Sequence, residues 1–191
     1  SASARDRDQA REMAALRTYL QTLSNSEILL IAFRNDADPA QRLRVRDGNA
    51  DAVVTAIAAL PLDGGSSYGA IDLRGIGAID QVLIIGDGLS NFGSADAHLI
   101  DDNGKAPAVF VLHAAQRADH AQLARLARSG GGQLIDLTTT SAAQASTQLQ
   151  QRGWRLLGSE IIAGECRDVT VTAPMRVDAT VTVSARCRGK S

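Results

Sequence analysis

The stretch of sequence that decides the fold is Val82-Leu83-Ile84-Ile85-Gly86-Asp87-Gly88-Leu89-Ser90-Asn91-Phe92-Gly93. Its four consecutive apolar residues, closed by a glycine, are typical of a strand buried on both faces in the middle of a parallel sheet. Asp87 stands at the carboxyl end of that strand, where open α/β sheets place their ligands. Gly86 and Gly88 allow the backbone to turn sharply. Asp87 is therefore a candidate metal- or phosphate-site residue, or else the cap of a turn.

Strands and helices alternate on both sides of this stretch. Apolar residues recur every three or four positions in residues 5–23, which predicts an amphipathic helix with Ser3 as its N-cap. Such alternation over residues 1–150 predicts a doubly wound, mostly parallel sheet with helices on both faces. A strand should precede the first helix, and we expect it upstream of residue 1. The further predicted strands are 28–33, 42–46, 107–112 and 134–137. The further predicted helices are about 50–60, 118–127 and 141–151.

The pattern changes near the C-terminus. From Trp154 onward apolar and polar residues alternate with a period of two, which predicts antiparallel strands with one buried face. We therefore expect an α/β domain over residues 1–157 and a β-rich segment over 158–191, either an added hairpin or the start of a further domain. Cys166 and Cys187 lie in this segment, and the sequence leaves open whether they form a disulfide or stay as two thiols.

Composition and motifs exclude several function classes. The 191 residues include 20 basic and 21 acidic side chains, for a net charge of −1, so no electrostatic footprint for nucleic acid or an anionic membrane is present. The apolar runs are far shorter than the roughly 18 residues of a membrane span. No Gly-x-Ser-x-Gly nucleophile motif and no nucleotide-binding glycine motif occurs. The three histidines, His98, His113 and His120, fit core or capping roles better than catalytic ones, and we expect no enzyme.

Three loops should converge at the carboxyl edge of the sheet. They are Ser1-Ala2-Ser3, Gly64-Gly65-Ser66-Ser67 and Gly86-Asp87-Gly88. Hydroxyl and carboxylate oxygens, completed by water, suit Mg²⁺, Mn²⁺ or Ca²⁺. Each loop taken alone is also ordinary turn chemistry.

Several segments give the chain a resemblance to the von Willebrand factor A domain, of the bacterial type that accompanies VIT (vault and inter-α-trypsin-inhibitor) domains. The matching segments follow the family's order over roughly residues 1–150. They are residues 1–8, 45–48, 62–69, 85–93 and 129–137.

The resemblance implies a metal-ion-dependent adhesion site. Ser1 and Ser3 would be the two serines of its Asp-x-Ser-x-Ser motif, Ser66 would stand at the threonine position, and Asp87 would be the late aspartate. The motif's first aspartate would fall before Ser1, which leaves one carboxylate for the cation. A serine in place of threonine keeps the hydroxyl but loses a rotamer restriction.

The resemblance also implies a function. We expect non-enzymatic, adhesive protein–protein recognition, in which an acidic side chain of a protein partner completes the coordination of a divalent cation, Mg²⁺ or else Mn²⁺ or Ca²⁺. Other domains of the parent chain are further expected partners, and the cell envelope or another extracytoplasmic site is the expected location. The alternative is a structural module of a larger bacterial cell-envelope protein with a vestigial metal site.

Overall fold

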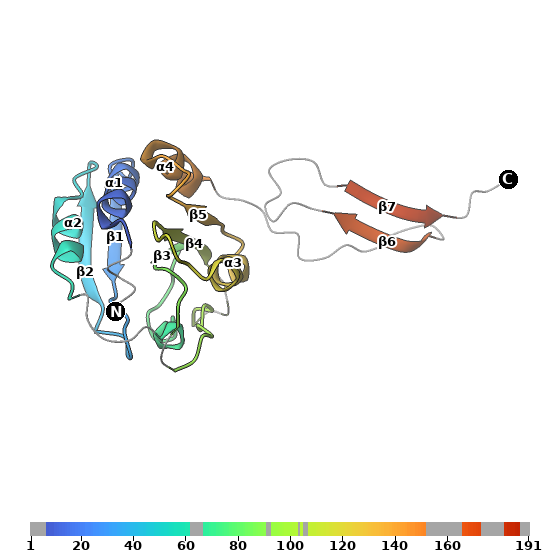
Figure 1. Ribbon diagram of the computed structural model, residues 1–191, viewed down its shortest axis with the longest axis horizontal. Coiled ribbons are helices and arrows are strands. Elements are labelled where there is room, and N and C mark those ends of the chain that lie inside the picture. Colours follow the sequence, from blue (N-terminus) through green and yellow to red (C-terminus); the bar gives the residue numbers. More distant parts are fainter. Residues whose placement is uncertain are drawn as a thin grey trace. The chain divides into compact units, whose positions relative to one another are not determined.

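The structure is a computed structural model of the chain (Figure 1). It describes residues 7–61, 67–90, 93–102, 104 and 107–151, together with the backbone of residues 166–172 and 182–187. The chain divides into two compact units, Ser1–Gln151 and Arg152–Ser191.

Among its described residues, the first unit contains a parallel sheet of three strands in the order β3-β4-β5. The strands are β3 (Gln81–Ile85), β4 (Ala108–His113) and β5 (Leu134–Asp136). Because β4 has a neighbour on each side, all of its residues except the first are buried. Among the described strands β3 pairs only with β4. In β3 only Ile84 is buried, and the other four residues are half-buried. The prediction that residues 82–85 lie in the middle of the sheet is therefore wrong for the described strands, where β4 takes that place.

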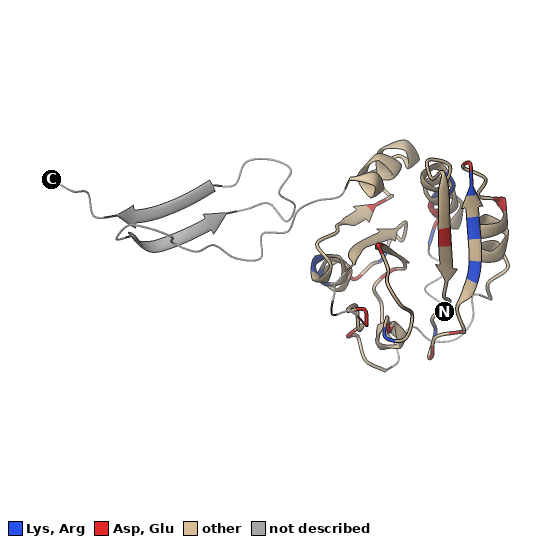
Figure 2. Cartoon of the chain, turned by 180° about the vertical axis from the view of Figure 1, so that it is seen from behind, with Lys and Arg blue, Asp and Glu red and all other residues tan. Residues whose placement is uncertain are grey.

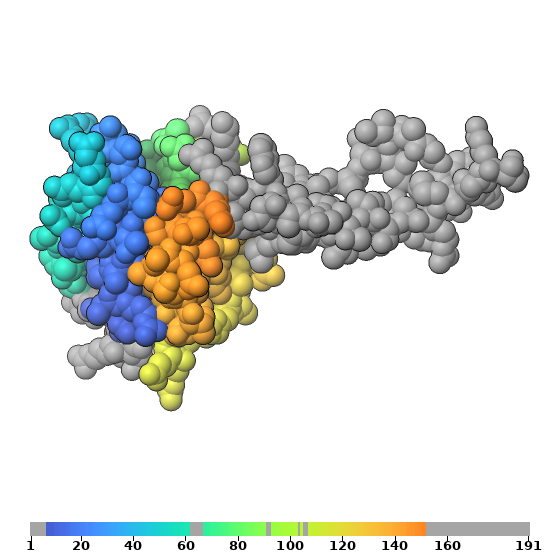
Figure 3. Space-filling model, turned by 90° about the horizontal axis from the view of Figure 1, so that it is seen from above, coloured from blue at the N-terminus to red at the C-terminus, as the bar shows by residue number. Residues whose placement is uncertain are grey.

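Helices cover both faces of the sheet, so the fold is doubly wound as predicted. Helices α1 (Gln9–Leu20) and α4 (Ala142–Gln150) lie side by side over one face (Figure 3). There Phe110 and Leu112 of β4 belong to the same core cluster as residues of both helices. Helix α3 (His120–Ser129) covers the opposite face, where Val109 and Val111 belong to a second cluster. Alternate residues of β4 thus enter two different cores, which explains its unbroken apolar sequence.

A second, antiparallel pair consists of β1 (Asn25–Leu30) and β2 (Gln41–Arg46). Helix α2 (Asp51–Ala58) packs against β2. Val45 is fully buried, whereas the alternating arginines of β2 are exposed and form a blue row in Figure 2. The prediction of a charged edge strand at residues 42–46 is confirmed among the described strands, and such charges discourage pairing with a foreign strand.

The helix predicted at residues 5–23 is shorter than expected. It begins after Asp8, whose side chain accepts a hydrogen bond from the backbone N–H of Arg11. Asp8, not Ser3, is therefore the N-cap, because its carboxylate reaches the free N–H groups of the first turn. Ser3 itself lies outside the described residues.

The strand predicted at residues 28–33 lies earlier, at Asn25–Leu30. A turn closed by the Phe33–Ala37 bridge and the Arg34–Asp38 ion pair follows it. This local turn, rather than the end of the apolar run, limits the strand.

The second unit contains one described β-ladder. Strands β6 (Cys166–Thr172) and β7 (Thr182–Cys187) pair in antiparallel fashion, as the alternating sequence predicts. Across the described part of the whole chain, we find no helix with the length and apolar character that crossing a membrane requires.

Candidate functional site

Asp87 lies at the carboxyl edge of the parallel sheet, two residues beyond the end of β3. The residue is only 4% exposed. One carboxylate oxygen, Oδ1, accepts the backbone N–H of Leu89 at 3.0 Å, and the backbone carbonyl accepts the N–H of Asp119 at 2.8 Å. The first bond is the turn-capping role that the sequence left open. It is also compatible with ligand binding, because a carboxylate has further lone pairs.

The two glycines that flank Asp87 are required by close contacts. A Cβ atom on Gly86 would lie 2.5 Å from the hydroxyl oxygen of Tyr68. Gly88 has a φ of +78°, and a Cβ there would lie 2.6 Å from the backbone oxygen of Asp119. A side chain would clash at either position, and at Gly88 it would also strain the backbone. The glycines therefore let Tyr68 and the start of α3 approach Asp87.

Tyr68 is the aromatic residue of this edge. It opens a short 3-10 helix, η2 (Tyr68–Ala70), and its ring lies 5.2 Å from the ring of Phe33. Its hydroxyl oxygen accepts the N–H of Gly88 at 2.7 Å. Burial, opposed by that hydrogen bond and reinforced by the charge of Asp87, raises the pKa of Tyr68. The phenol therefore keeps its proton and remains a donor beside the carboxylate.

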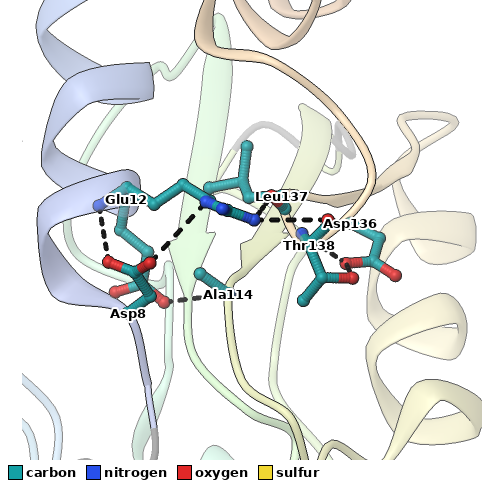
Figure 4. Close-up of polar contacts among 7 residues, drawn as sticks. Asp8, Glu12, Ala114, Asp136, Leu137 and Thr138 are labelled. Carbon is teal, nitrogen blue, oxygen red and sulfur yellow. Dashed lines mark hydrogen bonds and ion pairs between the residues drawn. The ribbon is translucent and has the colours of Figure 1, made fainter.

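A buried ion pair stands at the start of α1. Arg7 donates to both carboxylate oxygens of Glu12, with its Nε at 3.0 Å and its Nη2 at 2.6 Å. Glu12 also accepts the backbone N–H of Ala114, just beyond β4 (Figure 4). Burial disfavours the charged form of Arg7 and by itself would lower its pKa. The hydrogen bond to Glu12 and the negative charge of Glu12 outweigh this effect, so the pKa of Arg7 is raised. The negative charge of Asp87 acts in the same direction, which places a permanent cation in the neighbourhood of Asp87.

A second set of polar contacts joins α1 to the end of β5 (Figure 4). The guanidinium of Arg11 donates to the backbone oxygens of Leu137 at 2.9 Å and Thr138 at 3.2 Å. Asp136 accepts both the backbone N–H and the hydroxyl of Thr138. Partial burial opposes ionisation of Asp136, but these hydrogen bonds outweigh it and lower its pKa. The bonds from Arg11 therefore attach α1 to the segment between β5 and α4.

His113 ends β4 inside this framework and is 0% exposed. Neither ring nitrogen has a hydrogen-bond partner within the described structure, and Nε2 lies 3.6 Å from Oδ1 of Asp136. The ring contacts that of His120 edge-on, with centroids 4.9 Å apart. Burial, only partly offset by the charge of Asp136, lowers the pKa of His113. His113 is therefore a neutral core histidine, the role that the sequence favoured.

Of the four predicted metal ligands, the structure describes one. Asp87 lies at the expected edge, whereas Ser1, Ser3 and Ser66 lie outside the described residues. Within the described ranges, no three His, Cys, Asp or Glu side chains are grouped so that they could hold a metal ion. The described donor set is therefore a single carboxylate, which on its own is too small for a protein site for Mg²⁺ or Ca²⁺.

Sequence reasoning missed two polar residues of this edge, Glu12 and Tyr68. A signal for Glu12 was present: it falls three and four positions before Ala15 and Leu16, on the buried stripe of α1. A carboxylate on an apolar stripe needs a partner, and here that partner is Arg7. No comparable signal marks Tyr68, which follows a glycine- and serine-rich stretch of the sequence.

The comparisons with known proteins bear on the fold. No family model matches the chain, and no curated protein matches it. Among solved structures, the chain is similar to an aerotolerance-related membrane protein from Bacteroides fragilis, crystallised with multiple mutations to serines. The match has a TM-score of 0.56 and 17% sequence identity, and it covers 73% of this chain and 85% of that chain. The Ser1–Gln151 unit therefore has a doubly wound α/β fold of the von Willebrand A or Rossmann-like kind.

Proposed function

We propose that the α/β unit is a non-enzymatic recognition module of the von Willebrand A type that accompanies VIT domains. Its binding surface would be the carboxyl edge of β3, β4 and β5. A divalent cation, Mg²⁺ or alternatively Mn²⁺ or Ca²⁺, would be held there by Asp87 together with the hydroxyls of Ser1, Ser3 and Ser66. An acidic side chain of a protein partner would complete its coordination.

The position of Asp87 carries this proposal. It is a nearly buried carboxylate at the ligand-binding edge of an α/β sheet, with one oxygen bonded to Leu89 and no direct ion pair in the described residues. Burying a carboxylate removes its hydration, which is costly unless a positive group or hydrogen bonds compensate for it. A bound cation would supply that compensation, while Gly86 and Gly88 hold the turn in place.

A second candidate is a structural module of a larger bacterial cell-envelope protein, with a vestigial site. The observation that favours it is Arg7, whose charge already interacts with Asp87. A guanidinium near the carboxylate provides some of the compensation that a metal ion would otherwise provide. The fold likeness to a membrane protein agrees with an envelope location for either candidate.

Calorimetric titration of the purified full chain with Mg²⁺ and Mn²⁺ separates the candidates. We expect Asp87→Asn to weaken binding at least about tenfold, a loss of about 1.4 kcal/mol. The matched control is Asp51→Asn, since Asp51 pairs with Arg17 toward the other end of α1. Equal binding by the wild type and Asp87→Asn would refute the metal site at Asp87. Absence of binding by the wild type would favour the structural module.

A further inference from the structure

Cys166 and Cys187 are register partners in the β6–β7 ladder. They stand directly opposite each other, at the first residue of β6 and the last residue of β7. Residues facing one another in an antiparallel pair have Cβ atoms about 4.5–5.5 Å apart. Disulfides need Cβ atoms about 3.5–4.5 Å apart and Cα atoms about 4.4–6.8 Å apart. A small adjustment of the strands is therefore sufficient to join the two sulfurs.

The cysteine end of the ladder is the end that requires support. The pair next to it, Arg167 with Arg186, places like charges opposite each other, which destabilises a strand pair. The register then shifts between Arg167 and Thr170, so a β-bulge separates this end from the pairs at 170–172. A two-stranded hairpin is marginally stable in water even without such defects.

We propose that Cys166 and Cys187 form a disulfide that closes the open end of the β6–β7 hairpin. A small-molecule or protein disulfide serves as the oxidant. The thiolate of one cysteine attacks a sulfur of that disulfide, which forms a mixed disulfide and releases one thiol. The thiolate of the second cysteine then attacks the protein sulfur of the mixed disulfide and releases the second thiol. Two protein thiols are oxidised to one bond, and the external disulfide is reduced to two thiols.

The test is a peptide map of the full chain after incubation with oxidised glutathione. Trypsin cleaves after arginine, so without reductant we expect residues 156–167 to remain linked to Cys187-Arg188, at a mass two hydrogens below the sum of the free peptides. Alkylation in denaturant should find no free thiol before reduction and both thiols after it. Cys166→Ser and Cys187→Ser serve as controls, each of which should give a single glutathione adduct.

The register itself is tested by a shifted cysteine. In the double variant Cys187→Ser/Arg186→Cys, the second cysteine stands opposite Arg167 instead of Cys166. Equilibration with reduced and oxidised glutathione measures the effective concentration of one protein thiol toward the other. We expect this concentration to be at least about tenfold higher for the natural pair than for the shifted pair. Such a ratio corresponds to a difference of about 30 mV in reduction potential. Equal effective concentrations for the two pairs would overturn the proposal. So would a natural chain that forms only mixed disulfides with glutathione or intermolecular disulfides.

Discussion

Replacing Glu12 by Gln tests the buried ion pair that attaches α1 to the sheet. The Glu12 side chain is 2% exposed and accepts two hydrogen bonds from Arg7 and one from Ala114. Glutamine has nearly the same shape, but it turns one acceptor oxygen into an NH₂ donor. One contact to Arg7 then becomes donor against donor, and the guanidinium loses its counter-charge.

The expected loss of stability follows from the burial of the pair. Removing one partner of a buried pair costs about 3–5 kcal/mol. The Arg7 side chain is 17% exposed and therefore partly in contact with water. We accordingly expect a loss at the lower end of this range, about 3 kcal/mol. For a chain of this length that corresponds to a fall in Tm of roughly 6–12 °C.

Thermal unfolding followed by the helical circular dichroism signal measures this loss. The described helices lie between Gln9 and Gln150, so the signal from those helices reports on the first unit. Glu27→Gln is the matched control, because Glu27 makes the same kind of pair with Arg42 on an exposed surface. Exposed pairs contribute about 0–1 kcal/mol, so the control should barely move. Equal, small losses in both variants would refute the conclusion that Glu12 is a buried anchor.

Two further predictions concern the same edge. Gly88→Ala should destabilise the first unit by more than about 1 kcal/mol in urea unfolding, because Gly88 has a positive φ and the new Cβ would meet Asp119. Gly75 has a similar φ but open space around it, so Gly75→Ala should cost less. His113→Leu should reduce the pH dependence of stability. The pKa of His113 is lowered in the folded state by burial, so His113 favours folding above its unfolded pKa of about 6.5, and that contribution is lost as the pH falls below this value. Parallel stability–pH curves for His113→Leu and the wild type would contradict this.

The sequence determined the elements that depend on local pattern. The apolar run at residues 82–85 predicts β3, and the helical spacing of Leu16 and Leu20 predicts α1, because side-chain periodicity is a property of neighbouring residues. Gly86 and Gly88 predicted a tight turn that holds Asp87 at the edge of the sheet. Each of these predictions needed only a few consecutive residues.

The tertiary structure alone decided which strand is central and which polar groups are buried. An apolar strand has the same sequence pattern whether it pairs on one side or on two, so only the pairing shows that β4 is enclosed by β3 and β5. Likewise Arg7 and Glu12 become a buried pair only because the start of α1 lies against Ala114, about a hundred residues away in the chain. Strand order and burial depend on contacts between distant segments, and those contacts leave no local periodicity in the sequence.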